Sequence, residues 1–414
     1  YGLKASSAIR ISKSIGSDSR ITATAQTYNA SALSAGSGGI SGKSPADPMV
    51  IAGTVIATAT GSSAAILSTG PMNLEITGSL SGIDRTTGNP LGYAIRSGSF
   101  DGSGGFSSTA VNVVDTITIS GSGMVAGNVW LDGGNDTITL SGHADLSGVP
   151  SLDGGAGTAD TLTMSGWHTA KDSTAYPSGF GGDVTGWEVI TIGDDTSGSP
   201  SDVYLGPTKD TNGNTITKTF SGTAAGSLQM AIEAGSIIRA TGSSPGRYVI
   251  DGNLANSGTV SLVDGTPDDR LTVNATYSGT GSTAKLELDV KLDAAASSGW
   301  SARDTLDLLV VGADGTTGGT TQGSTLIQVY NSGSSVKKIS DGGKGILLVK
   351  VNGTNSGTTF SIDPSAAVFQ GASVSLDEES DGWYLQIASD GAGPTPNPTP
   401  PTTPVPPPDG HDDV

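Results

Sequence analysis

The sequence has no cysteine and few residues that carry a charge or an aromatic ring. Without cysteine the chain can form no disulfide, zinc–thiolate site or thiol nucleophile. Charged residues make up 14% of the 414 positions and aromatic residues 5%. Lys and Arg number 20 against 39 Asp and Glu, which gives a formal charge of −19. A chain this acidic repels phosphate backbones and anionic lipid, so we expect no binding to nucleic acid.

Long apolar runs and helical periodicity are also missing. No run of roughly 18 apolar residues exists, so the sequence contains no candidate membrane helix. No extended stretch repeats its apolar residues every 3.6 positions, which excludes helical bundles, coiled coils and most α/β enzymes. Glycine, with 63 residues, is abundant, as are Ser and Thr. The apolar residues alternate in short runs, such as 116–119 and 285–288, and this pattern predicts an all-β chain of many short strands.

A short motif recurs in the middle of the chain. Asp-Thr-Ile-Thr-Ile-Ser-Gly at 115–121 returns with small changes at 136–142 and at 160–166, spacings of 21 and 24 residues. Such a period is typical of one coil of a β-solenoid, in which each coil is too small to bury its own core and must stack on the next. Thr and Ser of the motif are expected to face outward. The expected inward column consists of Ile117, Ile119, Ile138, Leu140, Leu162 and Met164.

Composition divides the chain into three parts. Residues 1–245 carry the repeat pattern and predict a solenoid stalk. Residues 246–390 have denser charges and more regular strand patterns. The Pro- and Thr-rich tail at 391–414 predicts an extended spacer that tethers the chain to something beyond Val414, with a disordered terminus as the alternative. The chain opens at Tyr1 without a signal peptide, and we expect it to be a processed or excised piece of a longer protein.

The second part contains an ordered series of strand-like segments. They are Gly-Thr-Val-Ser-Leu at 258–262, Arg-Leu-Thr-Val-Asn at 270–274, Ala-Lys-Leu-Glu-Leu at 284–288, Gly-Ile-Leu-Leu-Val-Lys-Val at 345–351 and Gly-Trp-Tyr-Leu-Gln at 382–386. This series, closing just before a Pro-rich segment, resembles the C-terminal autochaperone segment of bacterial autotransporter passengers of the pertactin and AIDA kind. The resemblance implies a right-handed parallel β-helix secreted through an outer membrane. It also implies a translocator β-barrel encoded after Val414 and an autochaperone that folds first and templates the coils before it.

The function that this resemblance implies is non-enzymatic. We expect a virulence-associated passenger at the bacterial outer-membrane surface or in the extracellular space, acting as an adhesin or a structural surface fibre. Its expected partner is a ligand on a host cell, on a neighbouring cell or in the matrix, or a second copy of the chain. Trp383 and Tyr384 are expected to cap the last coils, with an ordinary core role for Trp383 as the alternative.

Two Leu-Asp-Gly-Gly turns form the candidate metal site. The segments 131–138 and 152–162 resemble the Gly-Gly-x-Gly-x-Asp repeats that bind calcium in RTX proteins, but the first lacks the third glycine and the second has an extra residue. The alternative is a corner turn whose Asp accepts hydrogen bonds from backbone amides. The candidate calcium ligands are Asp132, Asn135, Asp136, Asp153 and Asp160.

Aromatic residues gather in a window that interrupts the repeats between Gly166 and Trp187. We interpret the window as a loop that leaves the solenoid, where ligand contacts usually lie. The alternative is a small cluster that packs the loop against the rod. The candidate contact residues are Trp167, His168, Tyr176, Phe180 and Trp187.

Signals for catalysis are weak, and no catalytic residue is predicted. A protease-like segment at 193–200 has two residues inserted between Asp194 and Ser197, where the nucleophile turn tolerates none. Asp194, Asp195 and Asp202 form an acidic cluster with no basic residue adjacent in the sequence. A β-helix polysaccharide lyase or hydrolase, and a calcium-stabilised self-assembling surface-layer or fibre subunit, remain the alternatives to the adhesin.

Overall fold

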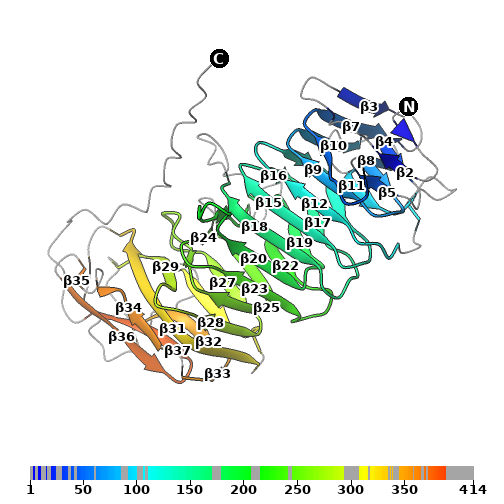
Figure 1. The fold of residues 1–414 in the computed structure, drawn as a ribbon. Coiled ribbons are helices and arrows are strands. Elements are labelled where there is room, and N and C mark those ends of the chain that lie inside the picture. Colours follow the sequence, from blue (N-terminus) through cyan, green and yellow to red (C-terminus); the bar gives the residue numbers. More distant parts are fainter. Residues whose placement is uncertain are drawn as a thin grey trace, which may run out of the picture.

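A computed structural model shows a chain of β-strands that winds repeatedly around one long axis (Figure 1). No α-helix occurs in the part of the chain that the structure describes, so the all-β prediction is confirmed. No helix long and apolar enough to cross a membrane is found there either. The predicted tail at 391–414 lies outside the described residues. The structure describes residues 3–4, 8–10, 15, 20–24, 30–35, 39–41, 44–59, 62–84, 92–99, 106–107, 111–169, 179–206, 215–240, 245–292, 307–315, 318–333, 336, 338, 345–357, 359–364, 368–369 and 372–387.

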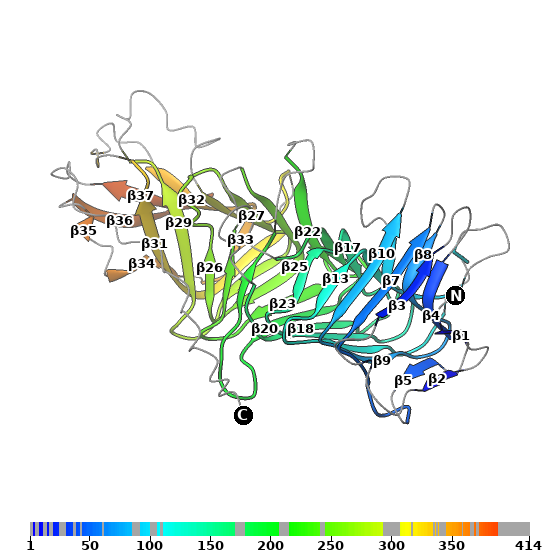
Figure 2. The same cartoon turned by 90° about the horizontal axis from the view of Figure 1, so that it is seen from above.

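Each coil contributes strands to three faces, and the strands of successive coils pair in parallel along each face (Figure 2). The first face consists of β1 (Leu3–Lys4), β4 (Ala30–Ala35), β8 (Ser63–Ser68), β11 (Tyr93–Ser97), β14 (Asn128–Trp130), β17 (Ser151–Asp153), β19 (Asp183–Thr185), β22 (Thr217–Ser221), the start of β25 (Arg247–Asn256), β27 (Arg270–Val273), β30 (Leu308–Val311) and β32 (Ile346–Val351).

The second face carries the repeated motif found in the sequence. It consists of β6 (Met49–Ile51), β9 (Asn73–Ile76), β12 (Thr116–Ile119), β15 (Thr137–Gly142), β18 (Thr161–Trp167), β20 (Val189–Gly193), β23 (Leu228–Ile232), the end of β25, β28 (Thr276–Gly279), the start of β31 (Gly319–Asn331) and β33 (Gly353–Asn355). Near the N-terminus, β2 (Ala8–Arg10) and β5 (Gly39–Ser41) form a separate parallel pair.

The third face is built from two successive sheets. The first sheet consists of β3 (Arg20–Thr24), β7 (Thr54–Ala59), β10 (Ser79–Asp84), β13 (Met124–Ala126) and β16 (Asp145–Gly148). The second sheet consists of β21 (Asp202–Tyr204), β24 (Ile237–Arg239), β26 (Thr259–Ser261), β29 (Lys285–Val290), the end of β31 and β34 (Thr359–Ile362).

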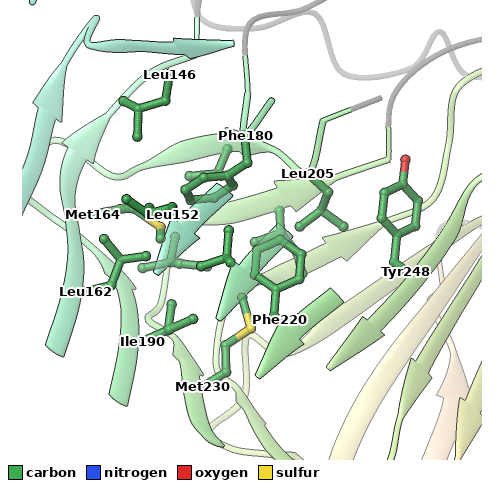
Figure 3. Packing of buried hydrophobic residues seen from close by; sticks show 14 of the residues in the cluster. Leu146, Leu152, Leu162, Met164, Phe180, Ile190, Leu205, Phe220, Met230 and Tyr248 are labelled. Carbon is green, nitrogen blue, oxygen red and sulfur yellow. The ribbon is translucent and has the colours of Figure 1, made fainter. Parts of the chain in front are cut away.

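The register of the second face explains why the motif repeats. Ile117 pairs with Ile138, Ile138 with Leu162 and Leu162 with Ile190, so identical motif positions lie above one another. Alternate residues therefore form a buried column, and the intervening threonines face outward. The predicted inward column is confirmed, and the fold is a parallel β-helix. Side chains from all three faces meet in the interior, as the cluster around Phe180 and Phe220 illustrates (Figure 3).

Stacking continues without a break where the sequence composition changes near residue 246. Strand β25 begins at Arg247 and pairs in parallel with both β22 and β23 of the preceding coil. The two predicted parts therefore share one continuous hydrophobic core. That residues 246–390 fold first and template the stalk stays a prediction.

The C-terminal end of the stack departs from the parallel pattern. Strand β37 (Gly382–Ile387) pairs antiparallel with β32 of the last coil and with β36 (Ala372–Glu379), and β35 (Val368–Phe369) pairs antiparallel with β36. Trp383 is only 3% exposed, and its ring lies 4.6 Å from that of Phe360. The antiparallel strands thus cover an edge that would otherwise be open to pairing with another chain. Trp383 belongs to this covering strand and is also a core residue.

A candidate ligand pocket on the first face

An open pocket of about 490 Å³ lies on the first face, over β11, β14 and β17. These strands belong to three successive coils and pair in parallel. The pocket is lined by Tyr93, Arg96, Phe106, Ser107, Asn128, Val129, Trp130, Ser151 and Asp153. Its size falls within the range of small-ligand sites, which span roughly 300–1,000 Å³.

Strand alternation explains which side chains reach this pocket. Val129 and its partner Leu152 are buried in the core, so their neighbours along each strand point to the outside. Register then aligns the outward residues of successive coils. Tyr93 lies beside Asn128, while Arg96, Trp130 and Asp153 form a second row across all three strands.

Arg96 is the most unusual side chain of the pocket. It is only 4% exposed, and its guanidinium carbon lies 3.5 Å from the ring centroid of Trp130 and 4.3 Å from that of Phe106. The ring of Tyr93 lies 4.6 Å from the same carbon and meets Phe106 edge-to-face at 4.9 Å. A guanidinium enclosed by three aromatic faces is held by cation–π attraction and by stacking. Arg96 therefore fixes the three rings relative to one another.

Burial shapes the electrostatics of the pocket. It lowers the pKa of Arg96, although a guanidinium remains protonated in proteins. It also raises the pKa of Asp153, whose Oδ1 accepts a 2.9 Å hydrogen bond from the backbone N–H of Gly155. The pocket thus combines aromatic rings with an amide, hydroxyls and one carboxylate. This lining is suited to a ligand that has both an apolar face and hydroxyl groups.

The candidate calcium ligands bond to the backbone of the coils. Asp132 Oδ2 accepts a 2.7 Å hydrogen bond from Val111 N–H, and Asn135 Oδ1 accepts one of 3.3 Å from Thr158 N–H. Asp153 caps its own turn at Gly155. Within the described residues, no group of three or more His, Asp or Glu side chains could hold a metal ion. These contacts correspond to the corner-turn alternative, and calcium binding stays a prediction.

The remaining two candidates, Asp136 and Asp160, belong to a ladder of carboxylates along the second face. Asp160 Oδ1 accepts from Asp136 N–H, and Asp136 Oδ1 accepts from Asp115 N–H, both at 2.7 Å. The ladder extends to Met72, whose N–H bonds to Asp115 Oδ1 at 2.7 Å, and to Glu188, whose Oε2 accepts from Asp160 N–H at 2.9 Å. Each acid therefore satisfies the backbone of the preceding coil.

Burial raises the pKa of every aspartate in this ladder. The pKa of Asp115 rises to about 7, that of Asp136 to about 8 and that of Asp160 to about 6. Neighbouring carboxylates contribute in the same direction. A second group in the later coils behaves alike, since burial raises the pKa of Asp264 to about 7 and that of Asp269 to about 8.

Three of the five predicted aromatic-window residues lie inside the rod. Trp167 and Trp187 are 0% exposed and Phe180 is 2% exposed. The indole N–H groups bond to backbone carbonyls, Trp167 to Ala144 at 2.9 Å and Trp187 to Leu152 at 3.1 Å. Phe180 packs edge-to-face between Trp167 and Phe220, and Figure 3 shows it among aliphatic core residues. Their burial favours the packing alternative over contact with a ligand.

The other two predicted contact residues are His168 and Tyr176. His168 is half-buried, with Nε2 3.3 Å from Ser199 Oγ, and burial lowers its pKa. Tyr176 lies outside the described residues.

Two acids of the cluster near residue 200, Asp195 and Asp202, lie in different environments. Asp195 Oδ1 accepts hydrogen bonds from the backbone of Ser197 and Ser199, which closes an exposed turn. Asp202 instead forms a buried ion pair with Arg239, with Nε 2.7 Å from Oδ1. The sequence shows no basic residue beside this cluster, but the next coil places Arg239 beside Asp202.

Tyr93, Arg96, Phe106 and Trp130 are not among the contact residues predicted from the sequence. One signal was present, because Asn-Val-Trp-Leu at 128–131 alternates and so places Trp130 outward between two inward aliphatic residues. An outward Trp in a chain with 5 Trp residues indicates an aromatic surface that a ligand or partner can contact. Its approach to Arg96 depends on stacking of coils whose lengths vary, which the sequence does not show.

No protein-family model matches the chain, and no curated protein matches it. Among solved structures, the chain is similar to the autotransporter UpaB from E. coli, with 14% sequence identity and a TM-score of 0.39. The match covers 94% of this chain and 85% of UpaB. The assignment to the parallel β-helices rests on the strand register described above.

Proposed function

We propose that this chain is a secreted, non-enzymatic rod of the autotransporter-passenger kind that acts at a bacterial cell surface as an adhesin or structural fibre. The observation that carries the proposal is the parallel stack of the described strands, which ends in an antiparallel cover. Parallel stacking extends from the first described strands to β34, and β36 and β37 close it at the C-terminal end. The ordered strand segments between 258 and 386 support the same assignment.

A rod of this kind suits adhesion for geometric reasons. Successive coils present similar outward rows, so weak contacts can act together along one surface. The acidic surface opposes nonspecific attachment to envelopes of the same charge. In this proposal the chain is displayed outside the cell by a translocator β-barrel that follows Val414, and its partner is a ligand on another cell or in the matrix.

The pocket supports binding rather than catalysis. Glycoside hydrolysis ordinarily needs two carboxyl groups across the scissile bond. Among the described residues that line the pocket, Asp153 is the single carboxylate, and one of its oxygens is committed to Gly155. The enzymatic alternative therefore has no matching acid–base pair at this site.

Binding of the purified rod to cells tests the proposal. Fluorescently labelled protein, covering residues 1–414, is added to bacterial and epithelial cells and to immobilised matrix proteins. We expect saturable binding that excess unlabelled protein displaces. A heat-unfolded sample of the same chain is the control for charge and composition. Binding that neither saturates nor depends on folding contradicts the adhesin proposal.

A further inference from the structure

We propose that the pocket over β11, β14 and β17 binds one sugar ring of a neutral glycan, with Trp130 as the stacking platform. This inference deepens the proposed function and rests on it, because it names the class of ligand that the surface rod would recognise. It is carried by three observations on the same site: the shape of the pocket, the fixed orientation of Trp130 and the polar residues beside it.

The shape of the pocket suits an internal unit of a polymer. The pocket is open rather than enclosed, and it lies across the strands of three successive coils. A ligand in it keeps part of its surface in water. A glycan chain can therefore enter with one ring seated and with the neighbouring rings continuing along the rod. A deep apolar cavity for a compact hydrophobic ligand would be enclosed instead.

Trp130 is held in place before any ligand arrives. The guanidinium of Arg96 lies 3.5 Å from the centroid of its ring and covers one face. Since Trp130 lines the pocket and is half-buried, the part of its ring that Arg96 does not cover borders the pocket. A hexopyranose ring has an apolar side of C–H groups, which packs against an electron-rich aromatic face. A ring already fixed loses little conformational freedom on binding.

Arg96 is a positioning residue in this arrangement. It is 4% exposed and is enclosed by Tyr93, Phe106 and Trp130. Its contribution is to keep Trp130 in one orientation rather than to contact the ligand.

Polar groups beside Trp130 match the hydroxyls of a sugar. The amide of Asn128, whose Nδ2 also donates a 3.4 Å hydrogen bond to the carbonyl oxygen of Gly92, can both donate and accept. The Ser151 hydroxyl can do both, and the Asp153 carboxylate accepts. Register places Asp153 next to Trp130 on the following coil, and Asn128 is two residues before Trp130 on the same strand. Sugar hydroxyls also donate and accept, so one ring can stack on the indole while its edge bonds to these side chains.

The charges favour a neutral glycan over an acidic one. Asp153 stands in the lining, and the whole chain carries a formal charge of −19. The single cation of the lining, Arg96, is covered by aromatic rings. A uronate or sulfated sugar would therefore meet a carboxylate without an exposed cation to offset it.

Isothermal titration and intrinsic tryptophan fluorescence test the inference with defined probes. The probes are cellohexaose, maltohexaose, mannohexaose and chitohexaose, with hexagalacturonate as the acidic comparison. We expect at least one neutral hexasaccharide to bind more tightly than hexagalacturonate. W130A should weaken that binding by at least about tenfold, whereas W130F, which retains an aromatic face, should weaken it less.

A second variant, S151L, tests the pocket independently in case W130A does not fold. S151L narrows the pocket and removes a hydroxyl while leaving the contact between Arg96 and Trp130 in place, so it should also weaken binding by at least about tenfold. Y204A is the matched control, because it removes an outward aromatic ring from β21, outside the pocket. Y204A should leave the affinity unchanged.

Several results would overturn the inference. The inference is wrong if no neutral probe binds, or if hexagalacturonate binds as tightly as the neutral probes or more tightly. It is also wrong if W130A and S151L both bind the neutral probe as tightly as the parent does. Failure here is distinguishable from failure of the proposed function. A rod that binds cells but no neutral hexasaccharide contradicts only the glycan pocket. A rod that binds a hexasaccharide through Trp130 but no cell or matrix contradicts only the adhesin role.

Discussion

The backbone N–H of Asp136 donates a 2.7 Å hydrogen bond to Oδ1 of Asp160, the equivalent aspartate of the next coil. The motif therefore repeats its Asp for a structural reason. Each Asp caps the backbone of the coil before it, so that one residue type serves every coil along this part of the second face. The same carboxylates are buried, which makes the rod sensitive to proton concentration.

The first prediction concerns this sensitivity to pH. Burial raises the folded-state pKa of Asp115 to about 7 and that of Asp136 and Asp269 to about 8, while in the unfolded chain these groups titrate near 3.8. Between those values the folded chain binds more protons than the unfolded chain, so the free energy of unfolding falls as pH rises. We expect a melting temperature several degrees lower at pH 8 than at pH 5, measured by circular dichroism.

Groups whose pKa is lowered oppose this fall in stability but are fewer or act mostly outside pH 5–8. Lys218, whose pKa burial lowers to about 8, acts mainly above pH 8. Hydrogen bonds from Arg270 and Lys350 lower the pKa of Asp314 to about 2, which affects stability only below about pH 4. Burial lowers the pKa of His168, but that is one group acting below pH 6.5.

D136N is the control for the pH prediction, because an amide oxygen still accepts from Asp115 N–H without needing a proton. Its melting temperature should depend less on pH than that of the parent, and an equal dependence would contradict the assignment to Asp136.

The second prediction concerns the glycine of a Leu-Asp-Gly-Gly turn. Gly155 has φ of +96°, and a Cβ there would lie 1.8 Å from the carbonyl oxygen of Asp132 in the preceding coil. G155A should therefore lower stability by clearly more than the roughly 1–2 kcal/mol of a left-handed backbone alone. Thermal unfolding measures the difference.

Gly198 provides the matched control for Gly155. It also has positive φ, +82°, but a Cβ there would meet nothing within 4 Å. G198A should cost only about 1–2 kcal/mol. If both variants lose the same stability, close approach of neighbouring coils is not what requires Gly155.

The third prediction concerns the buried ion pair on the third face. Removing one partner by R239M leaves the buried carboxylate of Asp202 without its cation, and we expect a loss of about 3–5 kcal/mol. The double variant D202L/R239M should recover part of that loss, because neither charge is then buried. Chemical denaturation of the three proteins checks the order.

An exposed ion pair of similar length is the comparison. Arg270 Nη2 lies 2.8 Å from Asp314 Oδ2, and both side chains are accessible to solvent. R270M should cost less than about 1 kcal/mol. Equal losses for R239M and R270M would show that burial does not set the value of these pairs.

The fourth prediction concerns folding order. A chain that ends at residue 245 lacks β25 and every later strand, so it exposes the paired edges of β22 and β23. We expect this fragment to be digested rapidly by protease, while the full chain resists. A fragment that folds alone at the normal rate and with normal stability would show that residues 246–390 are not a folding template.

The sequence predicted the architecture well because the architecture is local and repetitive. Alternation at Ile117 and Ile119, repeated at Ile138 and Leu140, is enough to identify an inward column. The positions of Trp167 and Trp187 were harder to predict. Trp167 is the last residue of β18, where the alternation of buried and half-buried residues breaks down, and Trp187 lies just before β20, outside any strand. Large aromatic residues there fill the interior.

The pocket escaped prediction for a different reason. Arg96 and Trp130 are 34 positions apart, whereas the recognised repeats are 21 and 24 residues apart. Their pairing follows only from strand register between β11 and β14. The contacts of Asp136 with Asp160 and of Arg239 with Asp202 could not be predicted for the same reason, since each joins residues of adjacent coils.

Nearest-neighbour stacking has a consequence for how such a rod can change in length. Because each described strand of the stack pairs only with strands of adjacent coils, a whole turn could be added or lost with new contacts needed only at the junction. The antiparallel strands β36 and β37 have no such freedom, since they fit the terminal surface alone. The length of the rod can thus change in units of one coil, whereas the antiparallel strands at its C-terminal end have to stay the same.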